Sequence, residues 1–383
     1  MLDRHPDHQV LRRLLFCSAI YHATVLISVV LPFVWSAKRF IDGARIIHTQ
    51  PGRGEMTSYD AARIALRPIF TAMDAMGLDI WSYGRVLDGD FLLINIFFGT
   101  LVFALVAVVM LAYELPSRFG WDAVLVAGVV VGLSPWSFVV SKEIVPLALC
   151  TAVLLTARAF RWSPTHVAVV LGAGLVLMSF YYRAYYLVIG ALLVASFVFA
   201  RRPRMLVLLY LGFFVFIFVA YQSLPLDEFT KGRADYLADT TASRISYPFG
   251  DGGRVGFTLN RFVTFLSLLV PVTLPLQAPA YLPFAGLQLA ITWRMLLALR
   301  PTTDAWTMLA AHVTLAVTAT SALFEPDYGS YFRHKVGFMV FLVLLLCPAV
   351  PARWGTSSGE TAPAPADPDD RACLTSTAVP ATR

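Results

Sequence analysis

One short segment of the chain concentrates side chains that could bind an anion and move a proton. From Glu325 to Lys335 the sequence reads Glu-Pro-Asp-Tyr-Gly-Ser-Tyr-Phe-Arg-His-Lys, which supplies two carboxylates, two permanent cations and a histidine. Arginine binds phosphate or carboxylate groups through two parallel hydrogen bonds, and a histidine or a carboxylate can transfer a proton. We therefore expect Asp327, His334 and Glu325 to act in catalysis. Arg333 and Lys335 are expected to bind substrate.

Two further positions carry charges inside or beside apolar runs. Arg183 stands between tyrosines in Phe180-Tyr-Tyr-Arg-Ala-Tyr-Tyr186, and Ser141-Lys142-Glu143 precedes another apolar run. Charges at such positions are costly and by default indicate a functional contact, so we expect Arg183, Lys142 and Glu143 to bind substrate as well. Each segment also has a structural alternative. The charges of 325–335 could pair with one another, Arg183 could extend to a membrane interface, and Lys142 could lie in a capped helix start.

The composition identifies the class of protein that must position these side chains. Of the 383 residues, 58% are hydrophobic and 14% are charged, whereas soluble domains have roughly 45–50% and about 25%. The mean hydropathy of +0.68 agrees. The four cysteines fit no metal-binding or redox spacing. These values exclude a soluble enzyme, a disordered chain, a coiled coil and a disulfide-stapled module, and they indicate a multi-pass membrane protein.

The net charge of +6 could suggest a nucleic-acid partner. The basic residues, however, stand mainly at the ends of apolar runs, which is the pattern that orients membrane proteins with their positive ends inside. We therefore expect no nucleic-acid partner. The residues in question are Arg12, Arg13, Arg158, Arg161, Arg201, Arg202, Arg204, Arg294 and Arg300.

These arginines predict the path of the chain. With both termini in the cytoplasm, the apolar runs make about ten spans of roughly 20 residues each, within one transmembrane domain over 1–350. Two long external segments, 37–89 and 223–261, interrupt the runs. The tail 351–383 is rich in alanine and proline and is expected to be disordered and cytoplasmic.

Two apolar runs cannot form single straight spans. The run 166–200 is too long for one crossing and is expected to form two short helices with Arg183 at the apex. The run 262–285 carries four prolines at intervals of four residues, so it is expected to be broken or re-entrant. A last span is expected over 336–350. In the first external segment, the pattern from Tyr59 to Met76 predicts an amphipathic helix on the outer leaflet.

In this topology, every unusual polar cluster falls on the external side. The sequence therefore predicts one external site at the level of the membrane. Glu325 and Asp327 could hold a divalent ion, but no set of metal ligands is evident, so we expect no resident metal or cofactor. Zincin, serine-hydrolase, P-loop and CxxC motifs are all missing from the sequence.

The layout resembles bacterial surface-polysaccharide polymerases of the O-antigen and exopolysaccharide type. These belong to the wider set of polyprenyl-linked membrane glycosyltransferases. The shared features are about ten spans, a long first external loop, the Ser-Lys-Glu segment, the intramembrane Arg183 and the closing Asp-x-Gly-Ser-x-x-Arg-His from Asp327 to His334. The resemblance implies that Arg183 and Arg333 hold a lipid pyrophosphate. It also implies that Asp327, Glu325 or His334 assists the acceptor hydroxyl.

Two features differ from the surface-polysaccharide polymerases and leave a second group of polyprenyl-linked glycosyltransferases as an alternative. The second external loop is modest for an O-antigen ligase type. The first loop, with Asp42 just after the first span, is more similar to mannosyl- or arabinosyltransferases that use polyprenyl-phosphate sugars. The expected function is glycosyl transfer from a polyprenyl-linked sugar at the external face of a bacterial inner membrane, together with membrane lipid and partners in a polysaccharide assembly system. The alternatives are a flippase or exporter of lipid-linked saccharides and a structural assembly partner.

Overall fold

The regular structure of the chain is helical. The computed structural model describes residues 6–34, 40–48, 58–84, 89–116, 119–199, 203–223, 243–250, 253–300, 302–325 and 327–347. All of them belong to one compact unit, Met1–Ala349. The expected tail 351–383 and about half of the expected loop 223–261 lie outside the described residues.

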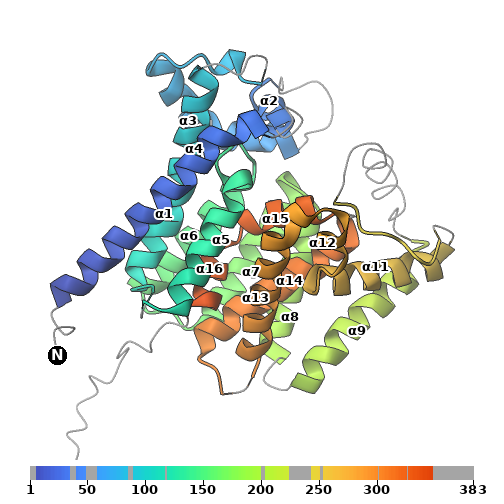
Figure 1. Ribbon diagram of the computed structural model, residues 1–383. Coiled ribbons are helices and arrows are strands. Elements are labelled where there is room, and N and C mark those ends of the chain that lie inside the picture. Colours follow the sequence, from blue (N-terminus) through green and yellow to red (C-terminus); the bar gives the residue numbers. More distant parts are fainter. Residues whose placement is uncertain are drawn as a thin grey trace, which may run out of the picture. The chain divides into compact units, whose positions relative to one another are not determined.

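Within these ranges the regular elements are helices, and an isolated backbone bridge joins Arg244 to Asp327. The expectation of an all-α fold is thereby confirmed. In chain order the elements are α1 (Pro6–Val34), α2 (Ile41–His48), α3 (Ser58–Ala75), η2 (Ile80–Ser82), α4 (Gly89–Ala112), α5 (Trp121–Ser137), α6 (Ile144–Ala159), α7 (Pro164–Tyr181), α8 (Tyr185–Phe199), α9 (Pro203–Ala220), α11 (Gly253–Leu269), α12 (Thr273–Gln277), η3 (Pro279–Tyr281), α13 (Leu282–Ala298), α14 (Ala305–Phe324), α15 (Tyr328–Val336) and α16 (Met339–Leu346) (Figure 1).

The structure does not support about ten spans. Among the described residues, four helices are long and apolar enough to cross a membrane, namely α4, α7, α14 and the stretch His8–Val30 of α1. The bent pair α15 and α16 makes five if it counts as one span. Other apolar helices, such as α5 and α6, have 17 and 16 residues, below the roughly 20 that a straight crossing needs. The length of an apolar run does not reveal where a helix ends inside it.

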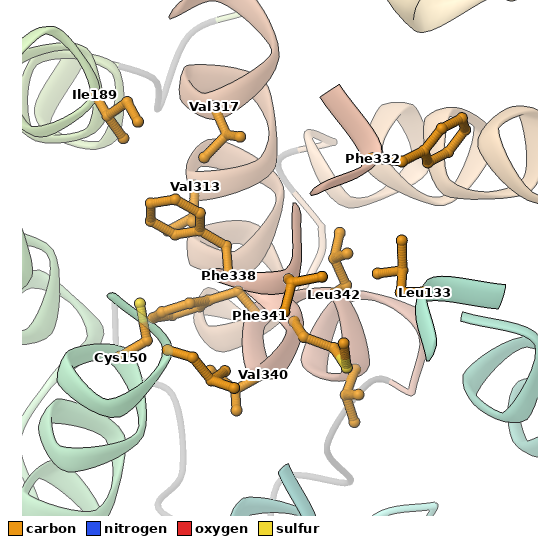
Figure 2. Close-up of a cluster of buried hydrophobic side chains, with 14 of the residues drawn as sticks. Leu133, Cys150, Ile189, Val313, Val317, Phe332, Phe338, Val340, Phe341 and Leu342 are labelled. Atoms are coloured by element: carbon orange, nitrogen blue, oxygen red, sulfur yellow. The ribbon is translucent and has the colours of Figure 1, made fainter. Parts of the chain in front are cut away.

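The expected last span 336–350 is also corrected. The chain bends by 87° between α15 and α16, and α16 has eight residues, about 12 Å of helix against a hydrocarbon core of about 30 Å. Every residue of α16 is buried. Figure 2 shows Phe341 and Leu342 in an apolar cluster with Val313 of α14 and Cys150 of α6. This helix therefore fills the interior of the bundle.

The expected break in the run 166–200 is present. Helices α7 and α8 pack against each other and are joined by residues 182–184, with Arg183 in the connection. Glycines allow their close approach, because a Cβ on Gly190 would lie 2.7 Å from the carbonyl oxygen of Gly172. Small residues serve the same purpose where helices pack closely in membranes.

The proline-rich run 262–285 is broken, as expected. Helix α11 ends at Leu269, and the short α12 and η3 follow before α13 begins at Leu282. Pro271 lies between α11 and α12, and Pro279 is the first residue of η3. Helix α11 starts at Gly253, inside the segment that was expected to be an external loop.

The amphipathic helix of the first external segment is present as α3, and protein covers part of its apolar side. Leu66, Phe70 and Met73 are buried, and the Phe70 ring lies 5.8 Å from that of Phe98 in α4. Part of the apolar stripe therefore packs against protein, and the expectation that α3 lies on the outer leaflet stays a prediction. This packing holds the start of α3 over the polar residues described below.

The packing of α7 on α8 gives a stability prediction. Gly190→Ala places a methyl group against the backbone of Gly172, and overpacking of this kind costs about 1–3 kcal/mol. Gly212→Ala in α9 is the matched control, since a Cβ there meets no atom within 4 Å. In thermal unfolding of the purified protein in detergent, we expect Gly190→Ala to lower the midpoint and Gly212→Ala to leave it unchanged or higher. Equal midpoints would contradict the close packing.

Candidate functional site

Three connections between helices meet at one group of polar residues. They are the turn between α5 and α6, the turn between α7 and α8, and the junction of α14 with α15. Helices α2 and α3 contribute the remaining members. We refer to this group as the polar cluster, and its members are Asp42, Tyr59, Lys142, Glu143, Arg183, Tyr185, Glu325, Arg333 and His334.

Local sequence explains how α15 is aimed. Helix α14 ends at Phe324, and Glu325 is extended, as expected for a residue that precedes a proline. Asp327 then begins α15, because its Oδ1 accepts a hydrogen bond of 2.8 Å from the Ser330 amide. Consecutive residues of a helix point about 100° apart. Arg333, His334 and Lys335 therefore reach three different sets of partners.

His334 lies between two buried carboxylates. Its Nε2 is 2.7 Å from Glu325 Oε1, and its Nδ1 is 3.1 Å from Glu143 Oε1. The hydroxyl of Tyr185 is 3.2 Å from the same Nδ1. All four side chains are buried. This part of the cluster can therefore hold and exchange a proton away from bulk water.

Arg333 forms an ion pair with Asp42 of α2 at the accessible edge of the cluster. Each of these side chains is 23% exposed. Tyr59 donates a hydrogen bond of 2.7 Å to Asp42 Oδ1. Burial acts to raise the pKa of Asp42, but the charges of Arg333 and Lys142, the Tyr59 hydrogen bond and the charge of Arg183 outweigh it and lower this pKa to about 2. Asp42 is therefore an ionised carboxylate at neutral pH.

Lys142 and Arg183 are the least satisfied basic side chains of the cluster, and burial together with the nearby charges of Arg183 and Arg333 lowers the pKa of Lys142. Lys142 is buried, with its Nζ 4.5 Å from the centre of the Tyr59 ring, a favourable cation–π distance. Within the described ranges this Nζ has no hydrogen-bond partner. Arg183 donates from Nε to Ser58 Oγ at 3.4 Å, and its guanidinium lies 5.6 Å from the Tyr185 ring. Both side chains retain donors that could bind an oxyanion.

Two of the expected site residues, Lys335 and Asp327, contact groups outside the polar cluster. Lys335 donates to the amide oxygen of Gln288 and lies 4.1 Å from the centre of the Tyr331 ring, in the buried interior. Asp327 is the N-cap of α15 and pairs through its backbone with Arg244. The polar cluster thus contains Arg183, Arg333, Lys142, Glu143, Glu325 and His334, whereas Lys335 and Asp327 contact other groups. Their roles in substrate binding and catalysis stay predictions.

The structure adds residues that were given no role from the sequence. Asp42, Tyr59 and Ser58 come from the first external segment, and Tyr185 comes from the start of α8. For Asp42 the available signal was its position as the carboxylate directly after the first apolar run. For Tyr185 it was the row of tyrosines around Arg183. Neither signal identifies a partner.

Among the residues that the structure describes, no group of three or more His, Cys, Asp or Glu side chains is arranged to hold a metal ion. We assign no residue to a metal. In comparisons with known proteins, no family model, no curated protein and no solved structure matches the chain.

The ion pair of Asp42 predicts a pH dependence of stability. A carboxyl whose pKa falls from 3.8 to about 2 on folding contributes roughly 2 kcal/mol. This contribution is complete above about pH 4 and disappears as the pH falls towards 2. In thermal unfolding, we expect Asp42→Asn to be clearly less stable than the unmodified protein at pH 6, and the difference to fall to less than half at pH 2.5.

The control is Asp74→Asn, which changes an exposed aspartate of α3. It should differ little from the unmodified protein at either pH. If the deficit of Asp42→Asn is the same at pH 6 and pH 2.5, the ion pair does not stabilise the fold.

Proposed function

We propose that this protein is a membrane-embedded glycosyltransferase. It transfers a sugar from a polyprenyl-phosphate or polyprenyl-pyrophosphate carrier to a sugar hydroxyl, at the external face of a bacterial inner membrane and in the synthesis of a cell-surface polysaccharide. The observation that carries the proposal is the polar cluster, which combines three cations with a histidine between two carboxylates beside apolar helices.

The three cations fit a phosphate that belongs to a lipid. Lys142 and Arg183 retain unused donors, and an arginine has five N–H donors, so Arg333 can keep Asp42 and still bind an oxyanion. Charge-assisted hydrogen bonds of this kind are about twice as strong as neutral ones. An isoprenoid chain would occupy the apolar environment next to the cluster while its phosphate enters it.

The remaining residues fit the proton chemistry of glycosyl transfer. The acceptor oxygen forms a bond to the anomeric carbon while the bond from that carbon to the phosphate oxygen breaks. The bonding electron pair leaves with the phosphate, whose charge the cations stabilise. The proton of the acceptor hydroxyl passes to the Glu325–His334 pair, and general-base assistance of this kind contributes roughly 10²–10⁴ in rate.

The sugar part of the proposal comes from the resemblance of the layout to surface-polysaccharide polymerases. Both branches of that resemblance use a carrier phosphate. They differ in whether the donor carries one phosphate or two, so a donor of each kind distinguishes them. The proposal keeps both termini in the cytoplasm, as the arginines at the ends of the apolar runs predict, and in this orientation the polar cluster lies on the external side.

The test is sugar transfer by the purified protein in vesicles with labelled lipid-linked sugars. We expect the unmodified protein to extend the acceptor. Arg183→Ala and Arg333→Ala should each lower the rate by about 10²–10³, because each removes a donor at the site where charge develops. Arg254→Ala is the control, since Arg254 lies exposed at the start of α11 against the Phe218 ring. It should retain the full rate.

Each of two results would overturn the proposal. One is full transfer by both the Arg183 and Arg333 variants while they are inserted normally in the membrane. The other is movement of the labelled lipid across the vesicle membrane without any new glycosidic bond, which would identify a flippase.

A further inference from the structure

The geometry around His334 constrains only one of its two ring nitrogens. Glu325 Oε1 lies 2.7 Å from Nε2, and an ionised carboxylate accepts hydrogen bonds but cannot donate one. While Glu325 is ionised, Nε2 therefore carries a proton whatever the charge of the ring. Any change of protonation takes place at Nδ1.

When the ring is neutral, Nδ1 presents a lone pair and needs a donor. Glu143 Oε1, 3.1 Å away, cannot supply one while it is ionised. The hydroxyl of Tyr185, 3.2 Å away, can. Among the described residues around His334, Tyr185 is the donor within reach of this nitrogen.

When the ring is charged, Nδ1 carries a proton and needs an acceptor. The Tyr185 oxygen can accept it, and the negative charge of Glu143 stabilises the imidazolium at 3.1 Å. The Tyr185 hydroxyl then turns to Tyr186, whose oxygen is 3.5 Å away. Because a hydroxyl both donates and accepts, the pair of tyrosines can reverse its hydrogen bonds as the ring changes charge.

We propose that Tyr185 is a positioning residue that gives His334 a hydrogen-bond partner in both protonation states, so that this buried ring can take up and release one proton. The use of that proton to activate an acceptor hydroxyl rests on the proposed glycosyl transfer. The proton site itself rests on the contacts of His334 alone.

The neighbouring charges come from several elements. The turn between α5 and α6 supplies Glu143 and Lys142, the turn between α7 and α8 supplies Arg183, the end of α14 supplies Glu325, and α15 supplies Arg333. A change of tyrosine to phenylalanine, at Tyr185 or at Tyr331, replaces none of these charged side chains. Differences between those variants therefore report on the tyrosine hydroxyls.

The experiment follows the imidazole nitrogens by NMR. The full chain is labelled with ¹⁵N-histidine, purified into lipid nanodiscs and titrated between pH 4 and pH 9, and His334→Gln identifies the signal among the seven histidines. In Tyr185→Phe the neutral ring loses its donor, while the charged ring can still turn to Glu143. We expect the titration midpoint to rise by about half to one pH unit.

A second variant should move the midpoint in the opposite direction. Glu143→Gln removes the negative charge beside Nδ1, so the midpoint should fall by about one unit or more. Tyr331→Phe is the matched control, because it removes another buried tyrosine hydroxyl, one bonded to Thr318 rather than to His334. It should leave the midpoint unchanged.

Three results would overturn the proposal. They are a His334 ring that does not titrate in the unmodified protein, an unchanged midpoint in Tyr185→Phe, and an equal shift in Tyr331→Phe. If Tyr185→Phe does not fold, a Glu143→Gln midpoint that does not fall also overturns it. Since the titration needs no substrate, a shift without sugar transfer would reject only the proposed function.

Discussion

The carboxylates of the polar cluster each lie close to an arginine or a histidine, and the arrangement of several connecting segments follows from this pairing. Water cannot compensate a buried carboxylate or guanidinium there, so each needs a partner from the protein. Glu143 and Glu325 lie against His334, and Arg333 pairs with Asp42. Because these residues come from different connections, their pairing fixes the ends of α6, α14, α15 and α2 relative to one another.

Apolar packing of the helices around α16 positions the segments that carry the polar cluster. Helix α16 is short and wholly buried, so it acts as a core segment around which α5, α6, α13 and α14 pack. The sharp bend before it lets α15 run in a different direction, with its histidine and arginine towards the polar cluster. Gly337, in the bend, lies so close to Pro146 that a Cβ would come within 2.8 Å of the proline ring. The bend is therefore held by α6.

The sequence predicted features that depend on local composition. Arg183 interrupts a long apolar run, and the break occurs there. The prolines after α11 end helices, as their missing amide requires. Partners far apart in the chain could not be predicted, because nothing near Arg333 in the sequence points to Asp42. The sequence also does not distinguish Lys335 from Arg333 and His334, because the direction in which each side chain leaves the helix decides what it contacts. The span count failed for a related reason, since helix ends inside apolar runs depend on packing with other segments.

The ion pair of Asp42 and Arg333 joins residues that are 291 positions apart, and this separation has a consequence for biosynthesis. A chain made from its N-terminus exposes the segment of Asp42 long before α15 exists. Asp42 therefore remains without Arg333 during the synthesis and insertion of nearly every other helix. Contacts of such long range form late. Completion of the polar cluster thus coincides with completion of the bundle, and a partly made chain has no assembled site.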